Sequence, residues 1–91
     1  MSQPEQEDLL VLGRAIREIR EQRDVTAEHL AAATDVELDQ IEALEAGRVD
    51  PTYELLLALA EGLGVRASAF VIRAEALAAE DRGGEGSSRE G

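Results

Sequence analysis

Apolar residues recur at every third or fourth position along most of the chain, which is the spacing of one face of an α-helix. Short polar breaks divide this pattern into five predicted helices. Four of the expected ranges are 8–23, 27–33, 37–46 and 67–80. The remaining helix, fourth along the chain, follows Thr52 and ends near Gly62 and Gly64. No stretch shows the strict alternation of a half-buried strand, so the pattern predicts an all-α domain.

The polar breaks contain residues that begin or end helices. Thr26 and Thr52 precede two of the apolar patterns, where a threonine oxygen can accept a backbone N–H of the first turn. Asp24 follows the first pattern, and an Asp tolerates the left-handed conformation that ends many helices. Gly47 and Gly64 are placed to end the third and fourth helices in the same way.

One small aliphatic core is expected from these helices. With 91 residues the chain is long enough for one domain and too short for two. We expect a flexible lead at residues 1–7, the domain at 8–81 and a disordered Gly/Ser-rich tail at 82–91. The predicted core residues are Leu12, Ile16, Ile19, Leu30, Ala31, Val36, Ile41, Leu44, Leu56, Leu59, Leu63, Val65 and Phe70.

The composition argues against an enzyme, a metal site and a membrane protein. The chain has no cysteine, and a single histidine, His29, cannot build a metal site or a catalytic triad. No serine lies in a nucleophile motif, and no glycine loop precedes a helix as a phosphate cradle would. No apolar run approaches the roughly 20 residues of a membrane span. We therefore expect a cytoplasmic, non-enzymatic protein without cofactor or metal.

The most informative segment is Thr26–Gly47, TAEHLAAATDVELDQIEALEAG, which predicts two short helices joined by a three-residue turn. Over about Leu12–Phe70 the chain resembles the Xre/Cro family of phage-repressor-like helix-turn-helix domains. The matching pieces are LGRAIREIRE at 12–21, Leu30-Ala31, the IxxLExG run at 41–47, Pro51-Thr52 and LLLALAEGLGV at 55–65.

This resemblance implies a five-helix, lambda-repressor-like fold and a transcriptional regulator whose third helix enters the major groove of double-stranded DNA. It also implies a salt bridge between Arg20 and Glu45, which suits a carboxylate placed beside core residue Leu44. The first residues of the second and third helices and the loop after the third would contact phosphates. The DNA-binding candidates are Ala27, Glu37, Leu38, Asp39, Gln40, Ala43 and Arg48.

These candidates are unusually acidic for a DNA-binding surface. The net charge is −11, every basic residue is Arg, and no base occurs from Thr34 to Gly47. Positive charge near the site is expected from Arg48 and from Arg14, Arg17 and Arg23 of the first helix. Alanine stands at position 27, where the family often has a phosphate-binding Gln. DNA binding should therefore be weak at ordinary salt.

Three functional interpretations of the acidic third helix remain, beside a non-functional one. The leading one is a sequence-specific regulator, since carboxylates can accept a hydrogen bond from cytosine and Leu38 or Ala43 can contact a thymine methyl. The main alternative is a protein-interaction module that uses the helix-turn-helix scaffold to bind a basic partner through the third helix. The third is a DNA-binding protein adapted to high salt, where charge is screened. Non-functional solvation of the acids is equally compatible with the sequence.

The fifth predicted helix carries apolar residues beyond Phe70, the residue expected to close the core. Val71, Ala74 and Leu77 continue its apolar face. They would either pack on the first helix or form a two-fold homodimer contact, which would place two recognition helices about one DNA turn apart.

Overall fold

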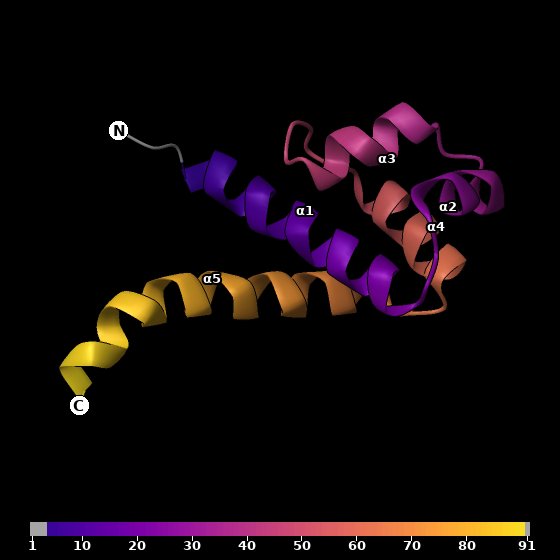
Figure 1. The fold of residues 1–91 in the computed structure, drawn as a ribbon. Coiled ribbons are helices and arrows are strands. Elements are labelled where there is room, and N and C mark those ends of the chain that lie inside the picture. The colour runs from indigo at the N-terminus through magenta and orange to yellow at the C-terminus, as the bar shows by residue number, and fades with distance from the viewer. Residues whose placement is uncertain (1–3, 91) are drawn as a thin grey trace.

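The computed structural model describes the backbone of residues 4–90 and the side chains of residues 7–81, and this part of the chain is helical without strands. The all-α prediction is therefore confirmed. The five helices are α1 (Pro4–Gln22), α2 (Ala27–Thr34), α3 (Leu38–Glu45), α4 (Tyr53–Leu63) and α5 (Ala67–Glu90). In Figure 1, α1 crosses the molecule with α5 below it, and α2, α3 and α4 cluster on its other side.

Two helices are longer than the apolar pattern predicted. α1 begins at Pro4 instead of Asp8, which is compatible with helix geometry because proline is tolerated in a first turn. α5 continues to Glu90 instead of ending at Glu80. The predicted flexible lead at 1–7 falls mostly, and the predicted disordered tail at 82–91 wholly, on residues whose side chains lie outside the described range. Both stay predictions.

The helix ends follow the predicted capping chemistry. The hydroxyl oxygens of Thr26 and Thr52 each accept a backbone N–H three residues later, at 3.0 Å. Asp24 takes the left-handed conformation with φ 58°, and Gly64 does so with φ 71°. Asp35 also has a positive φ of 61°, so it ends α2 and turns the chain toward α3.

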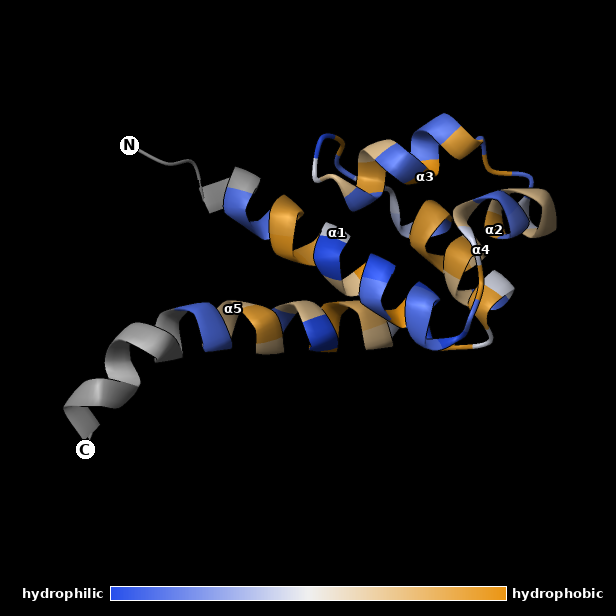
Figure 2. Ribbon diagram, viewed as in Figure 1, coloured by the Kyte–Doolittle hydropathy of each residue, from blue (hydrophilic) through white to orange (hydrophobic). Residues whose placement is uncertain are grey.

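The core is built from the large aliphatic side chains and Phe70. Most of the predicted positions are buried, and Figure 2 shows α4 as the most continuously hydrophobic of the short helices. The buried set includes Ile16, Ile19, Leu30, Ile41, Leu44, Leu59, Leu63 and Phe70. The other predicted members, Leu12, Ala31, Val36, Leu56 and Val65, are partly buried and pack against this cluster.

A second, smaller cluster joins α1 to α5. It consists of buried Ala15, Ala74 and Leu77, with Val11 and Leu12 packed against them. The prediction of the core did not include Ala15, because an alanine contributes little to a hydropathy pattern. This cluster determines how α5 lies along α1.

Among the described residues, no single helix is long and apolar enough to cross a membrane. The segments Tyr53–Leu63 and Ala67–Asp81 reach the length and composition of a span only as a pair bent by 100°.

Gly13 is the point of closest approach between α1 and α3. A Cβ atom at this position would lie 2.6 Å from the carbonyl oxygens of Leu44 and Glu45. These are backbone atoms at the end of α3, so they cannot rotate away as a side chain would. The absence of a side chain at Gly13 therefore allows α3 to sit directly on α1.

Replacing Gly13 by Ala is expected to lower the free energy of unfolding by about 1–2 kcal/mol. Overpacking against the carbonyls of α3 should outweigh the roughly 1 kcal/mol by which alanine favours a helix over glycine. Urea unfolding followed by circular dichroism measures the change, with the exposed Gln22→Ala of the same helix as a control. A G13A variant as stable as the parent would show that α1 and α3 can separate without cost.

Candidate nucleic-acid interface

The turn between α2 and α3 is held by Thr34, Asp35 and Glu37. The Thr34 hydroxyl donates to the Leu30 carbonyl at 2.6 Å and its oxygen accepts the Val36 N–H at 3.3 Å. Glu37 has an extended backbone and its carbonyl accepts the N–H groups of Gln40 and Ile41, which starts α3. The sequence thus forms two short helices joined by a tight turn, with α2 packed on both α3 and α4.

The orientation of α3 follows from its two buried residues. Ile41 and Leu44 are 0% and 1% exposed, so the side of the helix that bears them is turned into the core. Asp39, Gln40 and Glu42 consequently lie on the exposed side. Of the predicted DNA-binding residues, the structure exposes Glu37, Asp39, Gln40 and Arg48 and half-buries Ala27, Leu38 and Ala43.

The exposed side of α3 is therefore acidic and amide-bearing, with Arg48 as the nearest cation along the chain. Arg48 follows α3 in the loop, is exposed, and forms no ion pair within the described residues. Gln40 offers both a donor and acceptor, whereas Glu37 and Asp39 offer only acceptors when ionised. This surface can read base edges through hydrogen bonds but offers few partners for phosphate.

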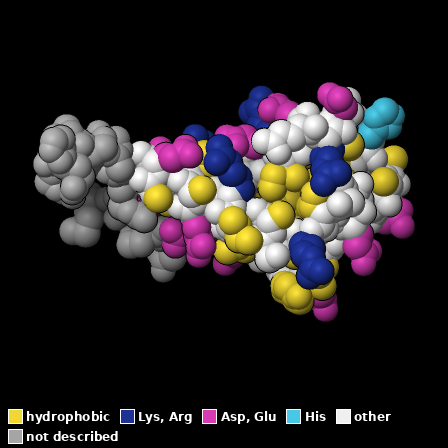
Figure 3. Space-filling model, turned by 90° about the horizontal axis from the view of Figure 1, so that it is seen from below, with side chains coloured by type: hydrophobic (Ala, Val, Ile, Leu, Met, Phe, Trp, Pro, Cys, Tyr) yellow, Lys and Arg dark blue, Asp and Glu magenta, His cyan; other side chains and the backbone are white. Residues whose placement is uncertain are grey.

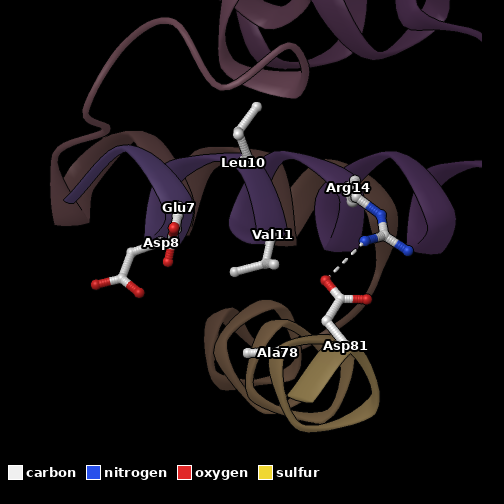
Figure 4. Close-up of a pocket in the computed structure, with 7 residues that line it drawn as sticks. All are labelled: Glu7, Asp8, Leu10, Val11, Arg14, Ala78 and Asp81. Carbon is white, nitrogen blue, oxygen red and sulfur yellow. Dashed lines mark hydrogen bonds and ion pairs between the residues drawn. The ribbon is translucent and has the colours of Figure 1, made fainter. Parts of the chain in front are cut away.

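Two of the three arginines that were expected to supply positive charge near this surface are paired with carboxylates, whereas Arg23 is exposed in the turn after α1. Arg14 pairs with Asp81 of α5 at 3.5 Å, and Figure 4 shows its side chain directed at α5. Arg17 pairs with Glu21 one turn along α1, at 3.1 Å. The expectation that Arg14 supplies positive charge next to α3 is wrong, because α1 separates α5 from α3 and Arg14 lies on the α5 side.

Arg20 and Glu45 form the salt bridge that the resemblance implied, between α1 and the last turn of α3. Two parallel hydrogen bonds join them, Nε to Oε2 at 2.6 Å and Nη2 to Oε1 at 2.9 Å. Nη1 of Arg20 also donates to the Val25 carbonyl at 2.9 Å. The hydrogen bond to Glu45 raises the pKa of the Arg20 guanidinium, against the opposing effect of burial. One side chain thus ties together α1, the loop before α2, and α3.

The residues predicted for a dimer contact are mostly used inside the chain. Ala74 and Leu77 are 7% and 2% exposed and pack against Ala15, which corresponds to the alternative of packing on the first helix. Val71 is 44% exposed and remains on the surface. The contribution of Leu77 is therefore to hold α5 on α1.

Replacing Leu77 by Ala is expected to lower the free energy of unfolding by about 2 kcal/mol, because the change leaves a cavity in the α1–α5 cluster. Ile72→Ala is the matched control, since Ile72 lies on the same helix but is 64% exposed. Thermal unfolding of both variants at several protein concentrations gives the comparison. If both variants lose the same stability, and if this loss depends on protein concentration, α5 is stabilised by another copy of the chain instead of by α1.

Among the described residues, no group of three or more His, Asp or Glu side chains is arranged to hold a metal ion. His29 is an exposed residue of α2, and its backbone N–H serves the Thr26 cap.

Comparison with known proteins supplies relatives for this arrangement. A family described as a helix-turn-helix domain matches residues 11–69, a range that includes α2, α3 and Arg48. The crystal structure of the clp gene regulator ClgR from Corynebacterium glutamicum is similar at a TM-score of 0.81 and 30% identity, covering 90% of this chain and 87% of that one. A second crystal structure of ClgR gives 0.72 and 32%, covering 76% and 90%.

The fold is also shared with the restriction-modification controller protein C.AhdI from Aeromonas hydrophila. Here the TM-score is 0.67 and the identity 24%, covering 69% of this chain and 96% of that one. No curated protein shows significant sequence similarity to the chain.

Proposed function

The chain belongs to the helix-turn-helix domain family, and from this premise we propose that it is a sequence-specific, DNA-binding transcriptional regulator of the Xre/Cro type. One observation carries the proposal. Ile41 and Leu44 turn one side of α3 into the core, and the opposite side is exposed. The structural similarity to the gene regulator ClgR extends over most of the chain and supports the same function. We also propose that the protein acts in the cytoplasm and is not an enzyme.

In this function α3 would lie in the major groove. Asp39 and Glu37 would accept hydrogen bonds from cytosine amino groups, and Gln40 would pair with adenine. Half-buried Leu38 and Ala43 would contact a thymine methyl only at close approach.

Phosphate contacts would come from Arg48 and from backbone N–H groups at the starts of α2 and α3. Arg14 and Arg17 are engaged with carboxylates, which leaves few side-chain cations for the DNA backbone. Specificity would therefore rest on base contacts, and non-specific affinity would be low. We expect a shallow salt dependence that corresponds to two or three phosphate contacts.

A second candidate function is supported by the acidity of α3 itself. Glu37, Asp39 and Glu42 are all exposed at the start or on the outer side of α3, and none of them forms an ion pair within the described residues. Arg20 of α1, which does reach α3, pairs with Glu45. A protein-interaction module with this surface would bind a basic partner, and DNA would be repelled.

A binding titration distinguishes the two functions. Fluorescence anisotropy of genomic DNA fragments and of a mixed-sequence duplex is measured at about 50 mM and at molar salt, a range in which ordinary DNA-binding proteins lose affinity steeply. The regulator should retain preference for particular fragments at both salts. Arg48→Ala should weaken binding to all DNA sequences alike, and Asp39→Asn should change which DNA fragment is preferred. Absence of any DNA preference at both salts would favour the protein-interaction module.

A further inference from the structure

The helices α1 and α5 meet at one end and diverge toward the other. They are joined at Ala15, Ala74 and Leu77, and Figure 1 shows them separating toward the beginning of α1. The space between them holds a cavity of about 570 Å³ and an adjoining one of about 280 Å³. Because both cavities are lined by Asp8, Val11 and Ala78, we treat them as one site and call it the α1/α5 wedge.

The floor of the wedge is apolar and incompletely filled. Val11 points from α1 toward Ala78 of α5, as Figure 4 shows. Ala78 has only a methyl group, so it leaves space that a longer side chain would have closed. Val71 lines the smaller cavity and is 44% exposed. The wedge can therefore accept a large apolar side chain without displacing a residue of the core.

The rim of the wedge carries negative charge. Glu7, Asp8, Glu75 and Asp81 line the two cavities and are exposed. Arg14 is the only basic residue among the described lining residues, and it is paired with Asp81. Figure 3 shows the molecule from below, on the side where α5 lies, with hydrophobic side chains among acidic and basic ones.

We propose that the α1/α5 wedge docks an amphipathic helical segment of a partner protein, in which Lys or Arg residues surround an apolar anchor. The anchor fills the space above Ala78, and the basic residues meet Glu7, Asp8 and Glu75. A second copy of this chain is a poor occupant, because at a net charge of −11 it would bring carboxylates to a rim that already carries them.

The wedge also lies apart from the proposed DNA surface. The described residues that line the two cavities belong to α1 and α5, and none of them belongs to α3. In Figure 4 Val11 points toward α5, whereas Leu10, which also lines the larger cavity, points toward the loop that follows α3. An occupant of the wedge therefore leaves the exposed side of α3 open. The proposal does not depend on DNA binding, and its test uses no DNA.

The test uses three labelled synthetic peptides with the full chain. One is an amphipathic helix of Leu and Lys, the second replaces each Lys by Glu, and the third replaces each Leu by Ala. Fluorescence anisotropy at about 50 mM and 500 mM salt gives the affinities. The Leu/Lys peptide should bind at least about tenfold more tightly than either control, since both an anchor and complementary charge are needed.

Paired variants locate the binding site. The double variant Glu7→Gln with Asp8→Asn should weaken binding of the Leu/Lys peptide about three- to tenfold. The double variant Glu54→Gln with Glu61→Gln on α4 removes the same charge and should leave the affinity for this peptide unchanged. Ala78→Phe, which fills the wedge, should weaken binding by about tenfold or more. Val71→Asp should also weaken it, and Ile72→Asp, one residue outside the wedge, should not. Circular dichroism establishes that each variant is folded.

Three results would overturn the proposal. Equal losses in the α1 and α4 double variants would mean that the acidic chain attracts basic peptides everywhere. Failure of the Leu/Lys peptide to bind more tightly than its controls would show that the wedge accepts no such segment. Sedimentation that gives a dimer of the parent chain and a monomer of Ala78→Phe would assign the wedge to a second copy.

Discussion

Replacing Arg20 by Ala is expected to lower the free energy of unfolding by about 3 kcal/mol, because it leaves the Glu45 carboxylate without a cation in a mostly buried position. The two side chains are only 12% and 10% exposed, so water replaces little of the lost interaction. The same change also leaves the Val25 carbonyl without its side-chain donor. Since small domains are stable by only about 5–15 kcal/mol, this loss is a large part of the total.

Arg17→Ala is the matched control for this prediction. Arg17 also forms an Arg–Glu pair, but the side chains of Arg17 and Glu21 are 64% and 54% exposed, so the change should stay within about 0.5 kcal/mol. Urea unfolding by circular dichroism measures both variants. If Arg20→Ala and Arg17→Ala unfold at the same urea concentration, the Arg20–Glu45 pair between α1 and α3 contributes no more stability than a surface ion pair.

The partners of this salt bridge came from family resemblance, whereas its geometry needed the structure. Spacing within one helix shows that Glu45 follows a core residue, but Arg20 lies 25 residues earlier and on another helix. The third partner, the Val25 carbonyl, is a backbone atom of a loop and has no signature in the side-chain pattern. Long-range polar contacts of this kind depend on how the helices cross, which periodicity does not specify.

The helix ends and the large core residues were predictable because their causes are local. Thr26 caps a helix through an N–H three residues away, and Asp24 ends one through its own backbone conformation. Ile41 and Leu44 determine which side of α3 is exposed, so the exposure of Asp39 and Gln40 follows from spacing alone.

The small residues were not predictable in the same way. Gly13 and Ala15 lie two positions apart on α1 and therefore on opposite sides of this helix. Gly13 allows α3 to approach, whereas Ala15 allows α5 to approach. A hydropathy pattern weights large side chains, whereas close helix crossings depend on small ones. The same limitation explains why Ala74 and Leu77 were candidates for a dimer contact, since a pattern shows an apolar face but not which surface covers it.

The largest change in DNA binding should come from reversing the charge at the start of α3. Replacing Glu37 and Asp39 together by Lys is expected to raise affinity for a mixed-sequence duplex on the order of 100-fold at about 50 mM salt. Both residues are exposed beside the groove that α3 would enter, and each substitution removes repulsion and adds one cation near a phosphate. One phosphate contact multiplies affinity by roughly 15 between molar and about 50 mM salt, so two contacts supply the expected gain.

The salt dependence separates this mechanism from a general loss of negative charge. The Lys double variant should steepen the slope of log affinity against log salt by the amount that about two phosphate contacts contribute. The double variant Glu37→Gln with Asp39→Asn should raise the affinity by a smaller amount and leave this slope nearly unchanged. The control is Glu54→Lys with Glu61→Lys on α4, which changes the net charge equally at a distance from α3. If the α4 variant gains as much affinity and slope as the α3 variant, DNA contacts the protein through its overall charge and α3 is not the surface that enters the groove.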